Sequence, residues 1–225
     1  MSVPISVRRG LCAAPIVLAG CSGPLSTLAP SGPAARDIAT LWWGMLIGSV
    51  VLTLMVVILL VMAFRQKREV EARFWTIGMG VWFSLGVLSA VLAAGLWVGE
   101  RIIPRDDEAV TVEAHAYQWG WVFRHTGADG AEVETDGRLH IPAGQPVDVL
   151  ITSEDVIHSF WVPQLAGKLD AIPGRVNRAR IKADTAGAYE GLCAEFCGVG
   201  HAHMRFTLEA HDSWPPDLSD EAEAP

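Results

Sequence analysis

Two long stretches without a charged residue constrain this chain more than any other feature. They are residues 41–64 (LWWGMLIGSVVLTLMVVILLVMAF) and residues 74–99 (FWTIGMGVWFSLGVLSAVLAAGLWVG). Each exceeds the roughly 20 residues that a helix needs to cross the hydrocarbon core of a bilayer. Buried helices of soluble proteins rarely run so far without a charge, and 51% of this chain is hydrophobic. We therefore predict two transmembrane helices.

The loop between these stretches predicts how the hairpin lies in the membrane. Residues 65–73 (RQKREVEAR) are rich in Arg and Lys, and short basic loops stay on the cytoplasmic side. Trp42, Trp75 and Trp97 lie near the ends of the stretches, where amphipathic rings favour the membrane interface. Both flanks of the hairpin are then expected outside the cytoplasm.

The N-terminus has the features of an export signal. Arg8 and Arg9 precede a short apolar run that ends in Leu-Ala-Gly-Cys at Cys21. A charged start, an apolar middle and small residues at the cleavage site are typical of a signal peptide. The pattern resembles a bacterial lipoprotein signal, so we predict a signal over residues 1–20 and a lipid on Cys21. A plain export signal or an uncleaved tail is the alternative.

Residues 21–40 are rich in Ser, Pro, Gly and Ala and are predicted to form a flexible tether. Residues 103–214 contain short β-rich runs separated by frequent turn signals, which favours an all-β sandwich or barrel. Residues 215–225 are expected to be a disordered acidic tail.

The outer part of the chain is strongly acidic. From residue 103 onward, Asp and Glu outnumber Lys and Arg by 21 to 9, in a chain of net charge −8. Such a face attracts a basic soluble partner over long range, and we expect no nucleic-acid partner. Solubilising charge is the ordinary alternative for any single residue. The candidate docking residues are Asp129, Glu132, Glu134, Asp136, Glu154 and Asp155.

The run GLCAEFCGVGHAHM carries the chemistry. It holds Cys193, Cys197, His201 and Met204, and thiolate and thioether ligands select copper. A zinc site could use the thiols and the histidine but has no use for Met204. A disulfide between the two cysteines would explain neither Met204 nor a histidine elsewhere.

A mononuclear blue-copper site takes one Cys, two His and an axial Met. This loop has one Cys too many for such a site. Two sulfurs can instead bridge two copper ions, each of which then needs an imidazole and a weak axial ligand. The second imidazole must come from outside the loop, and His158, in SEDVIHSFWVP, is the best candidate.

The loop, read as C-x-E-x-C-x3-H-x2-M, resembles the dinuclear copper (CuA) motif of subunit II of haem–copper cytochrome c oxidases. Residues 153–175 and the tryptophan-rich residues 115–123 resemble two further segments of that family. The resemblance implies a two-helix transmembrane hairpin plus an all-β cupredoxin-like Greek-key barrel. It also implies a place in the bacterial inner membrane with the C-terminal domain in the periplasm.

The family's function follows as an expectation. The subunit accepts electrons from cytochrome c at the two copper ions and passes them to haem in subunit I, where oxygen is reduced and protons are pumped. Subunit III and membrane lipid are the other implied partners. A Cys-x-x-Cys-His sequence is absent, so no haem is expected in this chain.

Residue roles also follow from the resemblance. The backbone carbonyl of Glu195 is a weak copper ligand, and its carboxylate reaches a magnesium ion shared with subunit I. Trp119 receives the electron, and Glu71 resembles a glutamate at the mouth of a proton path. Trp121 is expected in the core, on the same side of a strand as Trp119. Gly120 departs from the family's usual Tyr. The implied metal ligands are His158, Cys193, Glu195, Cys197, His201 and Met204.

Three other classes of protein share some of these features. A quinol oxidase subunit II shares the hairpin and the barrel but lacks the copper ligands. A nitrous oxide reductase shares the loop but has a large fused domain and no hairpin. A copper-delivery lipoprotein usually exposes Met- and His-rich tracts, whereas this chain has one compact site. Copper stoichiometry separates the last class from an electron-transfer protein: two coppers per chain indicate electron transfer, and one exchangeable cuprous ion indicates delivery.

Overall fold

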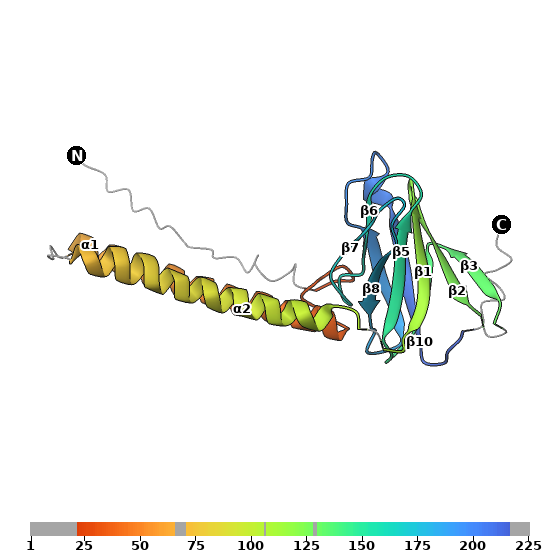
Figure 1. Ribbon diagram of the computed structural model, residues 1–225, viewed down its shortest axis with the longest axis horizontal. Coiled ribbons are helices and arrows are strands. Elements are labelled where there is room, and N and C mark those ends of the chain that lie inside the picture. The colour runs from red at the N-terminus through yellow and green to blue at the C-terminus, as the bar shows by residue number, and fades with distance from the viewer. Residues whose placement is uncertain (1–21, 66–70, 106, 128–129, 217–225) are drawn as a thin grey trace, which may run out of the picture.

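The computed structural model describes residues 22–65, 71–105, 107–127 and 130–216. The predicted signal peptide, the lipidation residue Cys21 and the docking residue Asp129 lie outside the described residues, as does the tail from residue 217. Within the described part, a long helical hairpin carries a β domain at one end (Figure 1).

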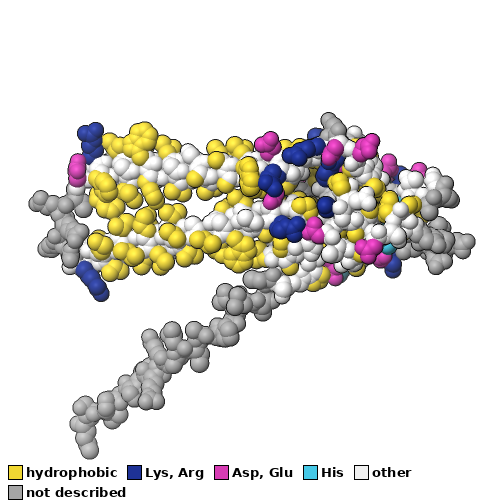
Figure 2. Space-filling model, turned by 90° about the horizontal axis from the view of Figure 1, so that it is seen from below, with side chains coloured by type: hydrophobic (Ala, Val, Ile, Leu, Met, Phe, Trp, Pro, Cys, Tyr) yellow, Lys and Arg dark blue, Asp and Glu magenta, His cyan; other side chains and the backbone are white. Residues whose placement is uncertain are grey.

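The hairpin consists of two helices that run side by side (Figures 1 and 2). The first is α1 (Pro33–Arg65), and the second joins a π-helical segment, η1 (Phe74–Phe83), to α2 (Ser84–Ile102). Both are long and apolar enough to cross a membrane. Almost none of their apolar side chains is buried, and Figure 2 shows these side chains covering both helices. The two predicted charge-free stretches lie inside these helices.

The helix α1 is longer than a membrane requires. At 1.5 Å per residue its length is about 50 Å, whereas the hydrocarbon core is about 30 Å thick. Its first residues, which belong to the stretch predicted as a tether, reach the β domain. There the backbone N–H of Ala35 donates to the carbonyl of Leu165 at 3.2 Å, and the N–H of Ser31 donates to the carbonyl of Gln164 at 2.7 Å.

One ion pair crosses this junction and a second joins the two helices beside it. Arg36 contacts Asp184 of the β domain at 3.0 Å, and Arg101 of α2 contacts Asp37 of α1 at 2.9 Å. Exposed pairs like these contribute at most about 1 kcal/mol each. The backbone hydrogen bonds and the close packing around Gly32 therefore matter more for holding the hairpin against the domain.

The β domain is a sandwich of two five-stranded sheets. One sheet has the order β3-β2-β1-β5-β8 and the other has the order β4-β10-β9-β6-β7. The strands are β1 (Val110–Tyr117), β2 (Gly120–Thr126), β3 (Glu132–Asp136), β4 (Arg138–Pro142), β5 (Val147–Ser153), β6 (His158–Trp161), β7 (Leu169–Ala171), β8 (Asn177–Ile181), β9 (Gly187–Cys193) and β10 (Arg205–His211).

Alternating burial along the strands builds the core between the sheets. On β2 and β10 every second side chain is buried, as expected for strands with one face toward a core. The centre is an aromatic cluster in which Trp121 lies 5.5 Å from Phe206 and 5.8 Å from Phe160, between ring centroids. Trp121 is fully buried, as predicted from its position in the sequence.

The two sheets meet along one edge, where β2 contacts β4. The N–H of Gly137 donates to the carbonyl of Trp121 at 2.8 Å, and the N–H of His140 donates to Nε2 of His125 at 2.9 Å. Burial, with repulsion from His140, lowers the pKa of His125 to about 4, so this ring is a neutral acceptor near pH 7. Each sheet also contains one parallel pair, β1 with β5 in the first sheet and β4 with β10 in the second. The predicted fold class, a helical hairpin plus a cupredoxin-like β domain, is confirmed.

The junction yields a prediction for Gly32. A Cβ at this position would lie 2.3 Å from the backbone oxygen of Lys182 and 3.0 Å from that of Leu165. Backbone atoms cannot give way as a side chain can, so Gly32→Ala should destabilise the full chain by about 1–3 kcal/mol, as overpacking commonly does. Thermal unfolding in detergent measures this. Gly44→Ala in α1, where a Cβ meets nothing within 4 Å, is the matched control, and equal melting temperatures would contradict the tight junction.

Candidate metal centre

The candidate ligands come together at the end of β9 and in the loop that leads to β10. Cys193 is the last residue of β9, and Met204 directly precedes β10. The N–H of Cys193 donates to the carbonyl of Met204 at 2.9 Å and closes the loop at its base. His158 is the first residue of β6, the strand beside β9. Neighbouring strands therefore bring together side chains from two distant parts of the chain.

The donor atoms of these residues lie within a few ångströms of one another. Nδ1 of His158 lies 3.1 Å from Sδ of Met204 and 3.8 Å from Sγ of Cys193. Sγ of Cys197 lies 3.6 Å from Nδ1 of His201 and 3.7 Å from Sδ of Met204. Apart from His201 at the rim, these side chains are buried.

The two thiols do not form a disulfide. Their sulfur atoms are 3.8 Å apart and both cysteines are free, whereas a disulfide bond is about 2.05 Å long. Burial, with the neighbouring Cys193, raises the pKa of the Cys197 thiol to about 11. Thiolate is the form that binds metals, so metal binding at this site must release protons.

This donor set fits copper. Two thiol sulfurs, two imidazole nitrogens and a thioether sulfur lie close together, and soft sulfur ligands together with imidazole suit copper. The carbonyl oxygen of Glu195 also lies near them, 3.2 Å from Sγ of Cys193. The alternative zinc site would leave the buried Met204 without a role.

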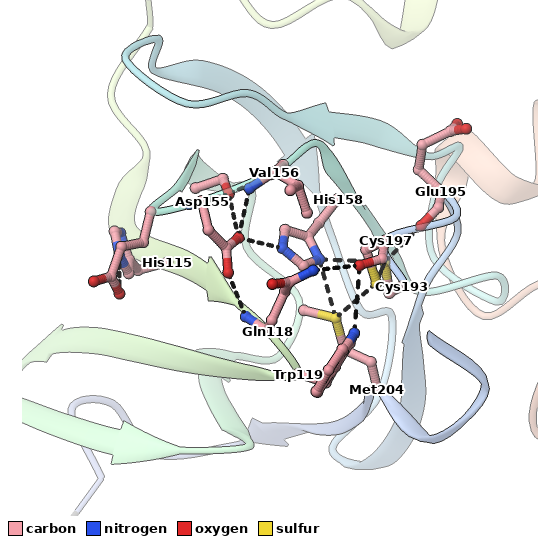
Figure 3. Close-up of polar contacts among 12 residues, drawn as sticks. His115, Gln118, Trp119, Asp155, Val156, His158, Cys193, Glu195, Cys197 and Met204 are labelled. Carbon is pink, nitrogen blue, oxygen red and sulfur yellow. Dashed lines mark hydrogen bonds and ion pairs between the residues drawn. The ribbon is translucent and has the colours of Figure 1, made fainter. Parts of the chain in front are cut away.

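The carboxylate of Glu195 points away from the sulfurs (Figure 3). It forms an ion pair with Lys168 at 3.0 Å, and Lys168 also contacts Asp170 at 3.3 Å. The hydrogen bonds that Lys168 donates to Glu195 and Asp170 raise its pKa. The predicted magnesium ligand therefore lies at a charged surface cluster rather than within the copper site.

A layer of hydrogen bonds surrounds the ligands (Figure 3). Oδ1 of Asp155 lies 2.9 Å from Nε2 of His158, and Oδ2 accepts from the N–H of Gln118 at 2.8 Å. The side-chain amide of Gln118 donates to the carbonyl of Cys197 at 2.7 Å. Burial opposes the charge on Asp155, but bonds from His158, Val156 and Gln118 hold the pKa of its carboxyl below the usual value.

Trp119 lies in the turn between β1 and β2, not on β2 itself. The prediction that it shares a strand face with Trp121 is therefore wrong, because β2 begins only at Gly120. Trp119 is 42% exposed, and its indole N–H donates to the carbonyl of Cys197 at 3.4 Å. Its ring packs on Gly200, where a Cβ would lie only 2.4 Å away.

Gly120 is explained by its neighbour Tyr117. A Cβ at Gly120 would lie 2.4 Å from the hydroxyl oxygen of Tyr117, so the ring of Tyr117 occupies the space that a larger residue would need. The hydroxyl of Tyr117 also contacts Asp136 at 3.5 Å. The turn thus keeps an aromatic residue beside Trp119, supplied from β1.

The remaining predicted residues lie away from the copper ligands. Glu71 is exposed at the start of the second helix, where its carbonyl accepts from the N–H of Phe74. Glu132 and Glu134 pair with Arg124 at 3.5 Å and 3.0 Å. Asp136 lies at the end of β3 nearer the Trp119 turn, since it pairs with Val122 while Glu132 pairs with Thr126. Glu154 is largely exposed.

The sequence did not single out Gln118, and it assigned Asp155 to docking alone. A local signal could have linked Asp155 to the site, because it lies three residues before His158 and metal-bound histidines usually donate to a carboxylate. Nothing in the local sequence marks Gln118, which meets Cys197 only through the fold.

Fold and site together define a membrane-anchored, copper-binding class of protein. A family model described as "Cytochrome C oxidase subunit II, periplasmic domain" matches residues 123–211. The "Alternative cytochrome c oxidase subunit 2" of Bradyrhizobium diazoefficiens is 34% identical over 154 residues, covering 55% of this chain and 56% of that protein. The "Cytochrome c oxidase subunit 2" of Alkalihalophilus pseudofirmus is 29% identical over 236 residues, covering 93% and 67%.

Solved structures give similar descriptions. The periplasmic domain of subunit II of a Bradyrhizobium japonicum cytochrome oxidase has a TM-score of 0.44 at 30% identity, covering 49% of this chain and 88% of that one. A haem–copper terminal oxidase dimer has a TM-score of 0.46 at 25% identity, covering 60% and 98%. The resemblance to subunit II of cytochrome c oxidases seen in the sequence is thus confirmed by the family model and by both relatives. The chain spans little more than half the length of the first relative named above.

The layer around His158 yields a prediction for Asp155. Asp155→Ala removes the partner of Nε2 of His158 and the anchor of Gln118, so copper affinity should fall by roughly 10–100-fold, as for other outer partners of metal ligands. Competition with a copper chelator measures the affinity. Glu154→Ala is the matched control, since the carboxylate of Glu154 is largely exposed and pairs with His115, at 3.9 Å, rather than with a candidate copper ligand. Equal losses in both variants would argue against a specific role for Asp155.

Proposed function

We propose that this chain is the electron-accepting subunit of a bacterial cytochrome c oxidase and holds a dinuclear copper (CuA) centre. The observation that carries the proposal is the meeting of two unbridged thiols with two imidazoles, a thioether and a backbone carbonyl, at separations of 3.1–3.8 Å. One thiol would suffice for a mononuclear copper site. Two central thiols with a histidine on either side suit a pair of ions.

The chain's residues divide between two ends of this arrangement. Cys193 and Cys197 would bridge the two ions. His158 and Met204, which lie 3.1 Å apart, would serve one ion. His201, near Cys197, and the carbonyl of Glu195 would serve the other. Copper held in this way supplies a one-electron couple, and the buried, hydrogen-bonded loop limits movement of the ligands when the charge changes.

Trp119 is the proposed point at which electrons arrive from cytochrome c. Its ring is partly exposed, and its N–H contacts the carbonyl of a thiolate ligand residue, Cys197. Gln118 contacts the same carbonyl, so two adjacent residues connect the outer surface to the loop. The acidic residues around this end, Asp136 and Glu154 among them, would steer a basic partner.

The oxidase assembly completes the proposal. Electrons pass to haem in subunit I, where oxygen is reduced and protons are pumped, and subunit III is a further partner. The carboxylate of Glu195 would bind a magnesium ion shared with subunit I, in exchange for its contact with Lys168. Glu71 would serve as the mouth of a proton path. No haem is proposed in this chain.

The membrane arrangement follows from charge. The basic loop 65–73 is proposed on the cytoplasmic side of the inner membrane, with the β domain in the periplasm and the apolar helix surfaces against lipid and the partner subunits. Processing at Cys21 and its lipidation belong to the same proposal, and the mass of the mature N-terminal peptide tests them.

Copper stoichiometry tests the centre directly. The copper-loaded full chain should hold two coppers, whereas Cys193→Ser and Cys197→Ser should hold fewer and lose electron transfer, because a neutral hydroxyl cannot replace a bridging thiolate. Met204→Leu should keep both coppers with an altered potential, since an axial thioether is a weak ligand. Metal analysis and paramagnetic resonance measure these outcomes, with His203→Gln, an exposed histidine of the same loop, as the control. Two coppers and full activity in Cys197→Ser would show that the thiols do not bridge.

Docking and electron transfer should respond to different substitutions. Asp136→Asn with Glu154→Gln should slow association of cytochrome c several-fold and flatten its salt dependence, because rim charges act on encounter. Trp119→Ala should instead slow electron transfer within the bound complex and leave the salt dependence unchanged, and Trp119→Phe should be milder. Rapid mixing of the oxidase with reduced cytochrome c over a range of ionic strengths separates the two. Parent rates in Trp119→Ala would place electron arrival at another residue.

A further inference from the structure

A second group of metal-binding side chains lies at the opposite end of β10 from the copper loop. Glu209 and His211 are two residues apart on β10, on the face that alternates with the buried Leu208 and Ala210. His140 of β4 is the parallel cross-strand partner of Glu209. From Met204 to the end of β10 the extended chain covers about 20 Å, so this group is separate from the copper ligands.

The donor atoms of the three side chains converge. Nδ1 of His140 lies 2.9 Å from Nε2 of His211 and 4.0 Å from Oε2 of Glu209, and all three ligand atoms lie within 4.8 Å of one another. The ring of His140 is buried, while the side chain of Glu209 is 31% exposed. The Glu209 side of the group therefore reaches solvent.

Neighbouring residues orient these donors. Arg138 donates to Oε1 of Glu209 at 3.3 Å, so the two carboxylate oxygens face different partners and Oε2 faces the histidines. On the other side, Nε2 of His125 accepts the backbone N–H of His140 at 2.9 Å. The Arg138 contact acts on a donor group directly, as outer contacts of metal ligands do, whereas the His125 contact fixes the backbone of β4 at His140.

We propose that His140, Glu209 and His211 form a second metal site, for one divalent ion of the zinc class. Two imidazoles and one carboxylate are the protein ligands of one common type of zinc site, with water in the fourth position. Magnesium and calcium prefer oxygen ligands alone, and cuprous copper prefers sulfur. Tetrahedral bonds of 2.0–2.1 Å separate two ligand nitrogens by about 3.3 Å, so the two rings need only a small outward shift.

An ion at this site would connect β4 to β10 at the edge where the two sheets meet. It would bind the folded chain and not the unfolded one, so it would raise the melting temperature. The site does not depend on the proposed electron-transfer function, because none of its ligands belongs to the copper loop.

Zinc titration of the full chain in detergent tests the site. Copper is loaded first, at two ions per chain with any excess removed by a chelator, because the thiols of the copper loop would also bind zinc and excess Cu²⁺ would itself occupy an imidazole–carboxylate site. Calorimetry should then show one further Zn²⁺ per chain, and Zn²⁺ should raise the melting temperature. Glu209→Gln and His211→Gln should weaken Zn²⁺ binding by more than the roughly 10–100-fold that outer-contact changes cost. The loss of Zn²⁺ affinity in Arg138→Gln should fall within that range of roughly 10–100-fold.

The control is His115→Gln, which alters a partly exposed histidine on the other sheet and should leave Zn²⁺ binding unchanged. Copper content and far-ultraviolet circular dichroism establish that each variant is folded. The proposal is wrong if the copper-loaded parent binds no further Zn²⁺. It is also wrong if Glu209→Gln and His211→Gln bind Zn²⁺ as tightly as the parent does. The group is then a hydrogen-bonded histidine pair.

Discussion

The pairing of β9 with β10 is the interaction on which the site depends. Cys193 ends one strand and Met204 precedes the other, and the hydrogen bond between their backbones closes an intervening loop of ten residues. Inside that loop Cys197 is held 3.8 Å from Cys193, close enough to share ions and too far apart for a disulfide bond. Each ligand is thus placed by backbone that the sheet has already ordered, and little freedom is left to be lost when metal binds.

The second constraint is the attachment of the hairpin to the β domain. Backbone hydrogen bonds from Ser31 and Ala35, with Gly32 packed between them, join the start of α1 to residues 164–165. A domain tied so closely to its membrane helices cannot rotate freely. In the proposed electron transfer to a membrane partner, a fixed height and orientation above the bilayer would keep the transfer distance constant.

Asp155 and Gln118 connect the candidate ligand His158 to Trp119 at the surface. Asp155 contacts the ligand His158, and it also holds the backbone of Gln118, next to Trp119. The surface at which electrons are proposed to arrive and the ligand sphere therefore share one hydrogen-bond network.

The sequence by itself determined the elements whose signals are local. Charge-free stretches of sufficient length predict the helices, since a bilayer imposes their length and composition. The spacing from Cys193 to Met204 predicts a copper loop, because ligand types within one turn-rich segment must lie close together. Tertiary structure alone decided which residues from elsewhere join them. Gln118 and Asp155 reach the site through the β1–β2 turn and the segment before β6, and Trp119 leaves the strand face that alternation predicted. His140, Glu209 and His211 meet only because β4 pairs in parallel with β10. Such contacts depend on strand order and register, which join residues far apart in the chain and leave no pattern in the local sequence.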